Sequence, residues 1–376
     1  MRGLSREGIR YSLLTFEPKE KLADSIKLIS ELDMPLRWKH LAYHNKPRHL
    51  ATFYDIAFGI LIVAFIIKKD KIKLLHARGF IAALIAFLPA KIFRIKILFD
   101  TRGLLADKYV CGGLLDKKGL TYKVMRLCED MLIRRSDSFT IETNRHAKAI
   151  IDSQDFGTLN DTNGVLSKMN VIPCCVDTDK FDYRLYAPRA ENKFNLVFLG
   201  KIETWYLIDK MLDFFVVASK EIIPLKFTFI TESEPAHIYA AIRKKAIDES
   251  NITIRKVNPK EIPALLSDAK ASVFFMNTYK QYSFLPIKFG ESLSCGLPVI
   301  INAGIGDCDE IVLEEKAGVV INDFSSREYE RATKELTALF SEEDKLRQRC
   351  RDVAKKYLSL EMGVARYRDI YKKLSC

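Results

Sequence analysis

The sequence predicts an α/β protein made of two doubly wound domains, in which helices cover both faces of parallel sheets. Short, almost continuously apolar segments alternate with longer segments of helical periodicity along most of the 376 residues, as in parallel sheets that are buried on both faces. The alternation occurs twice, and a polar, irregular stretch over residues 176–193 separates the two series. A chain of this length can form two hydrophobic cores.

The two series contain the expected strands. In the first series we expect strands at residues 9–16, 72–77, 94–100, 138–143 and 170–176. In the second series we expect them at residues 194–200, 225–231, 251–257, 271–277, 297–302 and 317–322. The chain after residue 325 is expected to be helical, with apolar residues at helical spacing over 362–374. Ligands of such proteins bind at the carboxyl ends of the strands, which predicts a site facing a cleft between the domains.

The composition is that of a soluble globular protein, but the charge is uneven. Residues 1–160 contain 28 Lys and Arg against 17 Asp and Glu, a net +11, whereas the rest of the chain carries +1. A basic half suits an anionic partner such as a membrane surface or a phosphorylated lipid, and a solvated basic surface explains the charge about equally well. No basic–aromatic run of the RNA-binding kind is present, so the motifs do not support a nucleic acid as partner.

Cysteine spacing and hydropathy indicate a cytoplasmic protein without a metal site. The eight cysteines and six histidines form no C-x-x-C pair and no cluster of zinc spacing. The N-terminal residues lack the apolar core of a signal peptide. The most apolar run, residues 56–67, is shorter than the roughly twenty residues of a transmembrane helix, and the next, residues 79–93, is interrupted by Pro89 and Lys91. We expect both runs to be buried helices of the first domain.

The segment "SFLPIKFGESLSCGLP" (283–298) carries the strongest indication of a ligand. Pro286 and Gly296 predict the two ends of a helix, on which Lys288 and Glu291 lie one turn apart on the same face. A cation near a helix N-terminus opposes the helix dipole, so we expect an anion beside Lys288. A carboxylate at this position can accept hydrogen bonds from a cis-diol such as ribose. The alternative is an exposed ion pair that contributes only tenths of a kcal/mol, roughly.

The strand at 194–200 ends in Gly200 and Lys201, where a ligand can approach the backbone and a lysine can bind phosphate. The segment is neither a G-x-G-x-x-G fingerprint nor a P-loop, and a tight turn with a surface lysine would explain it equally well.

Two neighbouring strands of the first half end in polar residues. His76 and Arg78 end one of them, and Asp100 and Arg102 end the next. Because the carboxyl ends of parallel strands meet at one sheet edge, this cluster could hold an acceptor and assist proton transfer. A hydrogen-bonded structural histidine is the alternative.

Several segments resemble the family-4 retaining glycosyltransferases, which have the GT-B fold. "VIPCCVDTDKF" (171–181) is similar to the family's interdomain element "IPNGVD…F", with Cys174 and Cys175 in place of Asn-Gly. "ESLSCGLPVI" (291–300) is similar to "E-A-x-A-x-G-x-P-V-I" of the donor-binding domain. Further similar segments are residues 257–275, 317–321 and 367–374, of which the last resembles the family's final helix, which crosses back to the first domain.

The first half resembles a variant found in bacterial surface-polysaccharide glycosyltransferases. "HAR" (76–78) and "FDTRG" (99–103) match its motifs, and residues 200–215 resemble its donor-domain start. The resemblance implies two Rossmann-like domains facing a cleft. An acceptor-side domain would span residues 1–178, with its first strand apparently missing. A nucleotide-sugar domain would span residues 179–376, with residues 360–376 packing back on the first domain.

The resemblance also implies roles for particular residues. Glu291 would bind the ribose of a nucleotide-sugar, Lys288 and Lys201 would bind its diphosphate, and His76 would lie near the transferred sugar. The other implied site residues are Gly200, the backbone around Val257 and Pro259 that would hold the base, Ser283 in place of the first of the family's two glutamates, and Arg78, Asp100 and Arg102 beside the histidine.

These roles predict a cytoplasmic retaining glycosyltransferase, peripheral on the inner face of the plasma membrane. It would use a nucleoside-diphosphate sugar, without a metal or other cofactor. The acceptor would be a glycan or a polyprenyl-linked glycan in the synthesis of bacterial envelope polysaccharide such as lipopolysaccharide or capsule. Two alternatives stay open, namely a nucleotide-sugar epimerase or hydrolase of the same fold, and a non-catalytic partner subunit of a glycosyltransferase complex.

Overall fold

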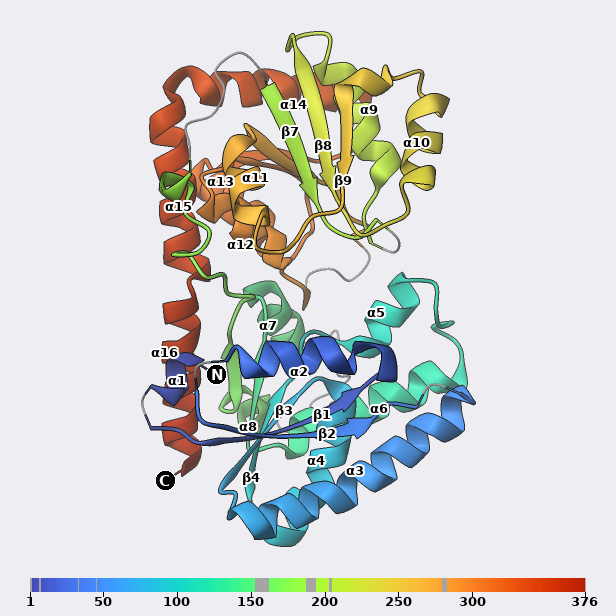
Figure 1. Ribbon diagram of the computed structural model, residues 1–376, viewed down its shortest axis with the longest axis vertical. Helices are drawn as coiled ribbons and strands as arrows, with labels where there is room; N and C mark the ends of the chain where they lie inside the picture. The colour runs from blue at the N-terminus through green and yellow to red at the C-terminus, as the bar shows by residue number, and fades with distance from the viewer. Residues whose placement is uncertain are drawn as a thin grey trace.

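The chain forms two α/β halves that lie one above the other, and a long helical segment runs beside both of them (Figure 1). The computed structural model describes residues 2–6, 8–32, 34–44, 46–152, 162–186, 194–202, 205–278 and 283–375. All strand pairings within its sheets are parallel. The expected alternation of strands and helices is therefore present in both halves.

The first half contains two parallel sheets. Strands β3, β4, β5 and β6 pair in that order, and β1 and β2 form a separate pair. The elements are α1 (Arg2–Ser5), β1 (Tyr11–Glu17), α2 (Leu22–Ser30), β2 (Leu36–Ala42), α3 (Arg48–Asp70), β3 (Leu74–Arg78), α4 (Phe80–Phe93), β4 (Lys96–Asp100), α5 (Leu105–Cys111), α6 (Leu120–Arg135), β5 (Ser138–Ile141), α7 (Asn144–Ile151), α8 (Thr162–Leu166) and β6 (Met169–Val171).

The second half contains one six-stranded sheet in the order β12-β11-β10-β7-β8-β9. Its elements are β7 (Phe194–Leu199), α9 (Ile208–Ala218), β8 (Leu225–Ile230), α10 (Pro235–Lys244), β9 (Ile252–Arg255), α11 (Ile262–Asp268), β10 (Ala271–Phe274), α12 (Ile287–Ser294), β11 (Val299–Asn302), α13 (Cys308–Glu315), β12 (Gly318–Ile321), α14 (Ser326–Leu339) and α15 (Glu343–Leu358). The strand order reverses between β7 and β10, and such a switch point is where open α/β sheets bind ligands.

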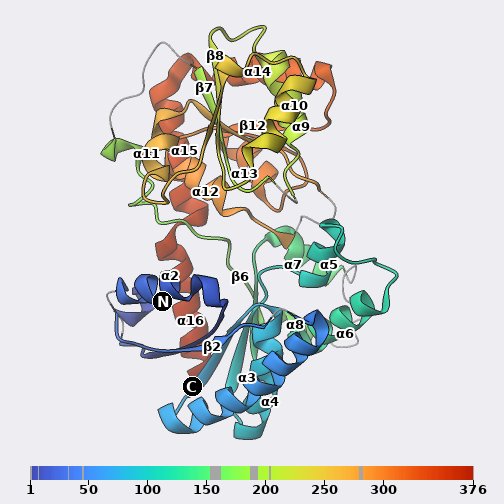
Figure 2. The ribbon, with the colours of Figure 1, turned by 45° about the vertical axis from the view of Figure 1, so that its right-hand side comes forward.

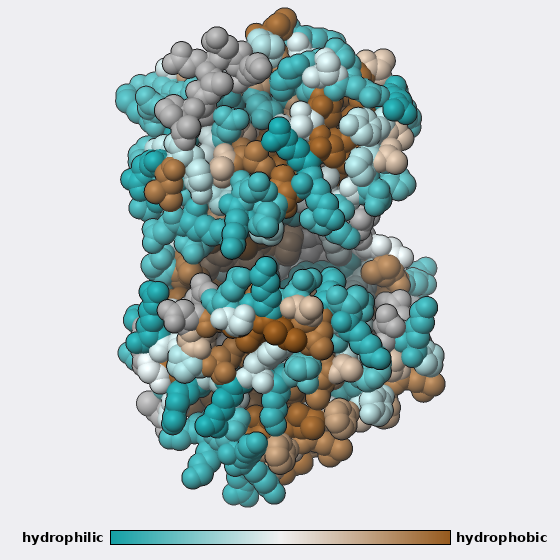
Figure 3. Space-filling view, viewed as in Figure 1, coloured by the Kyte–Doolittle hydropathy of each residue, from teal (hydrophilic) through white to brown (hydrophobic). Residues whose placement is uncertain are grey.

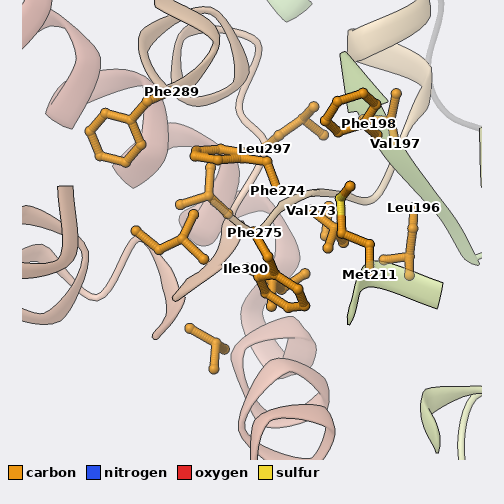
Figure 4. Packing of buried hydrophobic residues seen from close by; sticks show 14 of the residues in the cluster. Leu196, Val197, Phe198, Met211, Val273, Phe274, Phe275, Phe289, Leu297 and Ile300 are labelled. Carbon is orange, nitrogen blue, oxygen red and sulfur yellow. The ribbon is translucent and has the colours of Figure 1, made fainter. Parts of the chain in front are cut away.

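Apolar strands and helices build the core of the second half. Strand β7 contributes Leu196, Val197 and Phe198, all fully buried, against Phe274 of β10 and Phe289 of α12 (Figure 4). Close packing of this kind fixes the strand ends and the start of α12 relative to one another. The core therefore positions the backbone on which Gly200 and Lys288 lie.

The chain crosses between the two halves twice, and the two crossings lie side by side. The first follows β6, and the second lies between α15 and helix α16 (Leu360–Ser375). At the crossing, the amide of Val176 donates to the carbonyl of Leu358 at 2.8 Å, and that of Leu360 donates to the carbonyl of Val176 at 2.9 Å. Helix α16 then runs along the first half (Figure 2), where Ile370 packs with Leu98 and other buried residues. The domain boundary at residue 178 stays a prediction.

Two expectations about the first half need correction. The sequence prediction missed β2, whose polar residues Arg37, Lys39 and His40 are interspersed with apolar ones because the β1–β2 pair is only half-buried. The prediction that the apolar run at 56–67 is a buried helix is wrong for α3, since only 33% of its most apolar window is buried. Residues 50–70 of α3 are long and apolar enough to cross a membrane by length and composition.

A buried arginine connects the first crossing to the C-terminal helices. Arg351 of α15 is 1% exposed, and its guanidinium pairs with Asp182 at 2.7 Å. It also donates to the carbonyls of Thr178, Phe181 and Ser294 at 2.9, 3.3 and 3.2 Å. Burial raises the pKa of Asp182, but hydrogen bonds from Arg184 and the charge of Arg351 hold it below its usual range. One side chain thus connects the linker, α12 and α15.

We predict that Arg351→Leu lowers the free energy of unfolding by about 3–5 kcal/mol, because it leaves several buried polar groups without their partner. Urea unfolding followed by circular dichroism would measure the change. Arg349→Leu on the same helix is the control, because Arg349 is bound through an exposed hydrogen bond to the carbonyl of Lys316. We expect less than about 1 kcal/mol for it. Equal effects of the two changes would contradict this assignment.

Candidate functional site

Lys288 occupies the first turn of α12, as the sequence predicts. Pro286 precedes the helix with φ −65°, which suits a helix start. The Lys288 ammonium donates to the Tyr206 hydroxyl at 3.1 Å and lies 4.7 Å from the centre of the tyrosine ring. In the described part of the chain, no carboxylate lies within 4 Å of this half-buried ammonium. Burial lowers the pKa of Lys288, and the charge of Glu291 only partly offsets this.

Gly200 makes room for this ammonium at the end of β7. Its φ of +152° is one that L side chains rarely adopt, and a Cβ added to it would collide with the Lys288 ammonium. The Gly200 amide donates to the carbonyl of Ile230 at 2.9 Å, which holds the turn against the neighbouring strand. Backbone and cation therefore meet at the switch point of the sheet, where a ligand can reach both.

Glu291 lies one turn after Lys288 and is also half-buried. Burial raises its pKa, and the charges of Lys288 and Lys180 oppose the rise. Sequence reasoning missed Lys180, which lies in the stretch between the two halves and acts on Glu291 only in the folded chain. The three residues form a mixed-charge cluster that offers both hydrogen-bond acceptors and positive charge to a ligand.

The other predicted donor residues differ in position. Lys201 is exposed directly after Gly200. Val257 follows β9 and is partly buried, and Pro259 lies exposed in the next turn. Ser283 is 4% exposed and precedes α12, and its carbonyl lies against Gly103 of the first half, 3.1 Å from where a Cβ would be. Ser283 is therefore placed where the two halves touch.

His76, Arg78 and Asp100 come together at the edge of the first half. His76 Nε2 lies 3.7 Å and Arg78 Nε 3.9 Å from Asp100 Oδ2, and Thr140 donates to Asp100 Oδ1 at 3.1 Å. Although burial raises the pKa of Asp100, the interactions with His76 and Arg78 hold it below the usual range. This carboxylate organises the predicted cluster.

Two tyrosines of α16 complete that cluster, and no local pattern in the sequence indicates them. The Tyr371 hydroxyl lies 2.6 Å from His76 Nδ1, and the Tyr367 hydroxyl donates to Asp100 at 3.1 Å. These residues are almost 300 positions from His76, and only the expected return of the last helix could have suggested them. Because both nitrogens of His76 face protein groups, a structural role explains its geometry as well as a catalytic one does.

Arg102 is oriented differently from the other three predicted residues. Its guanidinium pairs with Glu142 at 3.1 Å and lies 3.7 Å from the Cys174 sulfur. The same Glu142 accepts from the amide of Leu285 at 3.3 Å, just before α12. Arg102 therefore contributes to the contact between the halves rather than to the His76 cluster, although its charge still acts on Asp100.

A second contact between the halves lies at the start of α7. Asp307 accepts from the amides of Asn144 and Arg145 at 2.7 and 3.0 Å. The Arg145 guanidinium pairs with Asp309 at 2.8 Å and with Glu310 at 2.9 Å. These bonds hold the halves together beside the hollow that Figure 3 shows between them. Across the described ranges, no three His, Cys, Asp or Glu residues are grouped so that they could hold a metal ion.

Part of the chain matches a known family profile. Residues 180–357 match the profile of the family described as "Glycosyl transferases group 1". A search of curated protein sequences finds no match.

The structure is similar over nearly its whole length to solved proteins. It aligns with a glycosyltransferase from Rickettsia africae (TM-score 0.70, 13% identity, 97% of this chain and 98% of the other). Sucrose-phosphate synthase from Thermosynechococcus elongatus gives a TM-score of 0.69 at 12% identity, with 97% and 98% covered. HepE of Anabaena in complex with UDP gives 0.67 at 12%, with 98% and 100% covered. The chain therefore has the GT-B fold, and its residues 180–357 match the glycosyl transferases group 1 profile.

Proposed function

We propose that the protein transfers a sugar from a nucleoside-diphosphate sugar to a glycan acceptor. The observation that carries this proposal is the half-buried Lys288 ammonium, which lies against the backbone of Gly200 without a carboxylate partner among the described residues. Burying a cation without an opposite charge is unfavourable, and an anionic ligand removes the penalty. The glycosyl transferases group 1 match over residues 180–357 supports a nucleotide-sugar as the source of that anion.

Each donor residue has a task that its chemistry suits. The diphosphate lies between Lys288, Lys201 and the N-terminus of α12, whose free amides and dipole favour negative charge. The Glu291 carboxylate accepts hydrogen bonds from the ribose hydroxyls, and the segment around Val257 and Pro259 holds the base. When the sugar–oxygen bond breaks, negative charge accumulates on the leaving diphosphate, and the fixed cations stabilise it in that state more than in the ground state.

On the acceptor side, His76, Arg78 and Asp100 lie at the edge of the first half and face the transferred sugar, and Arg102 supports the closed arrangement. We propose that the reaction retains the configuration of the sugar and needs no metal. The acceptor is a polyprenyl-linked glycan of bacterial envelope polysaccharide, and the enzyme works on the inner face of the plasma membrane. HepE of Anabaena has been solved with UDP and with UDP-glucose, which makes uridine donors the first to test.

The two alternatives are separated by following the labelled sugar. The protein would be incubated with a labelled nucleotide-sugar, with and without a lipid extract that contains acceptors. Transfer into the lipid phase supports the proposal. Release of free sugar or a changed sugar in the absence of acceptor supports a hydrolase or an epimerase. Nucleotide binding without any turnover supports a partner subunit.

We predict that Glu291→Ala weakens nucleotide-sugar binding at least tenfold, or about 1.4 kcal/mol, because the ribose loses its acceptor. Isothermal titration calorimetry would measure the affinity. Glu314→Ala removes an exposed carboxylate of α13 and is expected to bind like the wild type. An unchanged affinity in Glu291→Ala would remove the ribose assignment.

We predict that Gly200→Ala weakens diphosphate binding about tenfold or more, since the new methyl group must displace the Lys288 ammonium. The comparison is with Gly113→Ala, a position with φ +68° and no atom within 4 Å of an added Cβ. That change strains the backbone without crowding a ligand, so it should lower the melting temperature and leave the affinity intact. Wild-type affinity in Gly200→Ala would refute the role of this close approach.

We predict that sugar transfer survives EDTA, because protein cations rather than a metal ion neutralise the leaving diphosphate. The initial rate would be measured before and after chelation, and again after Mg²⁺ is restored. Loss of activity with EDTA and its recovery with Mg²⁺ would count against this mechanism.

A further inference from the structure

The outward face of helix α3 is apolar. Six side chains, each between 39% and 72% exposed, lie along it. Apart from the adjacent Phe53 and Tyr54, successive members are three or four residues apart: Leu50, Phe53, Tyr54, Phe58, Leu61 and Phe65. We name this set the α3 stripe. A surface helix of a soluble domain normally presents polar residues outward, and a continuous apolar patch marks an interaction surface. Figure 3 shows brown side chains over α3 at the base of the first half, with teal ones at the C-terminal end of the helix.

The stripe is free of charge because Asp55, the one carboxylate between Leu50 and Ile67 of α3, is turned inward. From Leu50 to Ile67 the sequence contains no Lys, Arg or Glu, and Asp55 is its single acidic residue. Asp55 is 6% exposed and accepts from the His44 backbone amide at 3.0 Å, and His44 Nδ1 lies 2.6 Å from it. An uncharged stripe of this length, about four helical turns, suits burial in an apolar phase.

Helix α4 also exposes apolar side chains, and two lysines lie over its aromatic rings. Helix α4 packs against α3 and exposes Leu88 and Ile92. Lys68 lies 5.5 Å above the ring of Phe93, and Lys91 lies 5.5 Å above that of Phe87. A lysine beside an aromatic ring can keep its ammonium group at a polar boundary while the ring is buried, as at a membrane surface.

A basic pocket opens at the C-terminal end of the stripe. It has a volume of about 480 Å³ and lies between β1, β2 and α3, with Arg37, Lys39, Lys69 and Asp70 among its lining residues. The Asp70 carboxylate accepts hydrogen bonds from the Ser12 hydroxyl at 2.7 Å and from the Arg37 guanidinium at 2.9 Å. The three cations exceed the one carboxylate by two charges, which favours an anion in the pocket.

The two lysines of this pocket share one aromatic ring of the stripe. The Lys39 ammonium lies 4.6 Å and that of Lys69 5.7 Å from the ring centre of Phe65. Among the residues that the structure describes, neither lysine has a carboxylate within 4 Å. A phosphate between the ammonium groups would offset their repulsion, and an acyl chain attached to it would lie on the stripe.

We propose that α3 docks the protein on an anionic lipid bilayer. The α3 stripe enters the boundary between headgroups and acyl chains, and the pocket of Arg37, Lys39 and Lys69 binds a lipid phosphate. The helix lies on the membrane rather than across it, because its other face packs against β1 and α4. A second copy of the chain is a poorer occupant, since a symmetric contact would bring the same cations together. The inference rests on the proposed function only in assigning a lipid-linked acceptor to this membrane.

Vesicle binding of the purified full chain tests the apolar part of the proposal. Co-sedimentation would use vesicles of phosphatidylcholine with about a third phosphatidylglycerol, compared with phosphatidylcholine alone. We expect preferential binding to the anionic vesicles, and at least tenfold weaker binding in Leu61→Glu, which puts a charge in the stripe. Leu313→Glu is the matched control, because it changes a similarly exposed leucine (59% against 67%) on a helix of the other half. Equal binding of the two variants, or no binding by the wild type, overturns the proposal.

The pocket has its own test. Lys39→Glu with Lys69→Glu should abolish the preference for anionic vesicles, whereas Lys220→Glu with Lys244→Glu, exposed lysines of the other half, changes the net charge equally and should retain it. Equal loss in both double variants would show a net-charge effect and overturn the pocket. A wild-type dimer that Leu61→Glu dissociates, without vesicle binding, would assign the stripe to a second copy instead.

Nucleotide binding separates this inference from the proposed function. The melting-temperature rise caused by a nucleotide-sugar should be the same in Leu61→Glu as in the wild type. Vesicle binding without any nucleotide effect would overturn the proposed function alone, and the reverse result would overturn the docking surface alone.

Discussion

The half-buried charge of Lys288 is the constraint around which the second half of the chain is arranged. The helix start at Pro286, the side-chain-free approach of Gly200 and the hydroxyl of Tyr206 all hold one ammonium in a place that is poorly solvated. Without a ligand this arrangement costs stability, because burial disfavours the charged form. An anionic ligand bound beside the Lys288 ammonium would offset this cost. The packed core beneath β7 and α12 supplies the rigidity that makes this arrangement persist.

Charged contacts and the C-terminal helices hold the two halves together. Glu142, Arg145 and Asp307 form charged bonds across the gap, and the C-terminal helices connect the halves on one side. Through Tyr367 and Tyr371, α16 also holds the acceptor-side cluster in place. The donor and acceptor sides are thus fixed by one continuous set of contacts. In the proposed arrangement, the donor binds in the cleft and the apolar surface on α3, at the base of the first half, contacts lipid.

Local patterns in the sequence were sufficient to predict most of the strands and the position of Lys288. Buried parallel strands are apolar runs, and α12 is bounded by Pro286 and Gly296, so strands β3 to β12 and the position of Lys288 could be predicted. Strand β2 could not, because one half-buried pair of strands mixes Arg37 and Lys39 with apolar residues. The exposure of α3 was also missed, since an apolar helix has the same composition whether protein or lipid covers it. Tyr367 and Tyr371 depend on packing between distant segments, which no local pattern records.

The most direct test of the central claim compares how the protein binds a nucleoside diphosphate and the corresponding monophosphate. The nucleotide would be the one that most stabilises the protein in a thermal-shift screen of UDP, GDP, ADP and CDP, and calorimetry would then give both affinities. Lys288→Met keeps an apolar stem of similar length and removes the charge. We predict that the wild type prefers the diphosphate at least tenfold and that Lys288→Met loses this preference. A preference that survives in Lys288→Met, or a protein that binds none of the four nucleotides, would contradict the account.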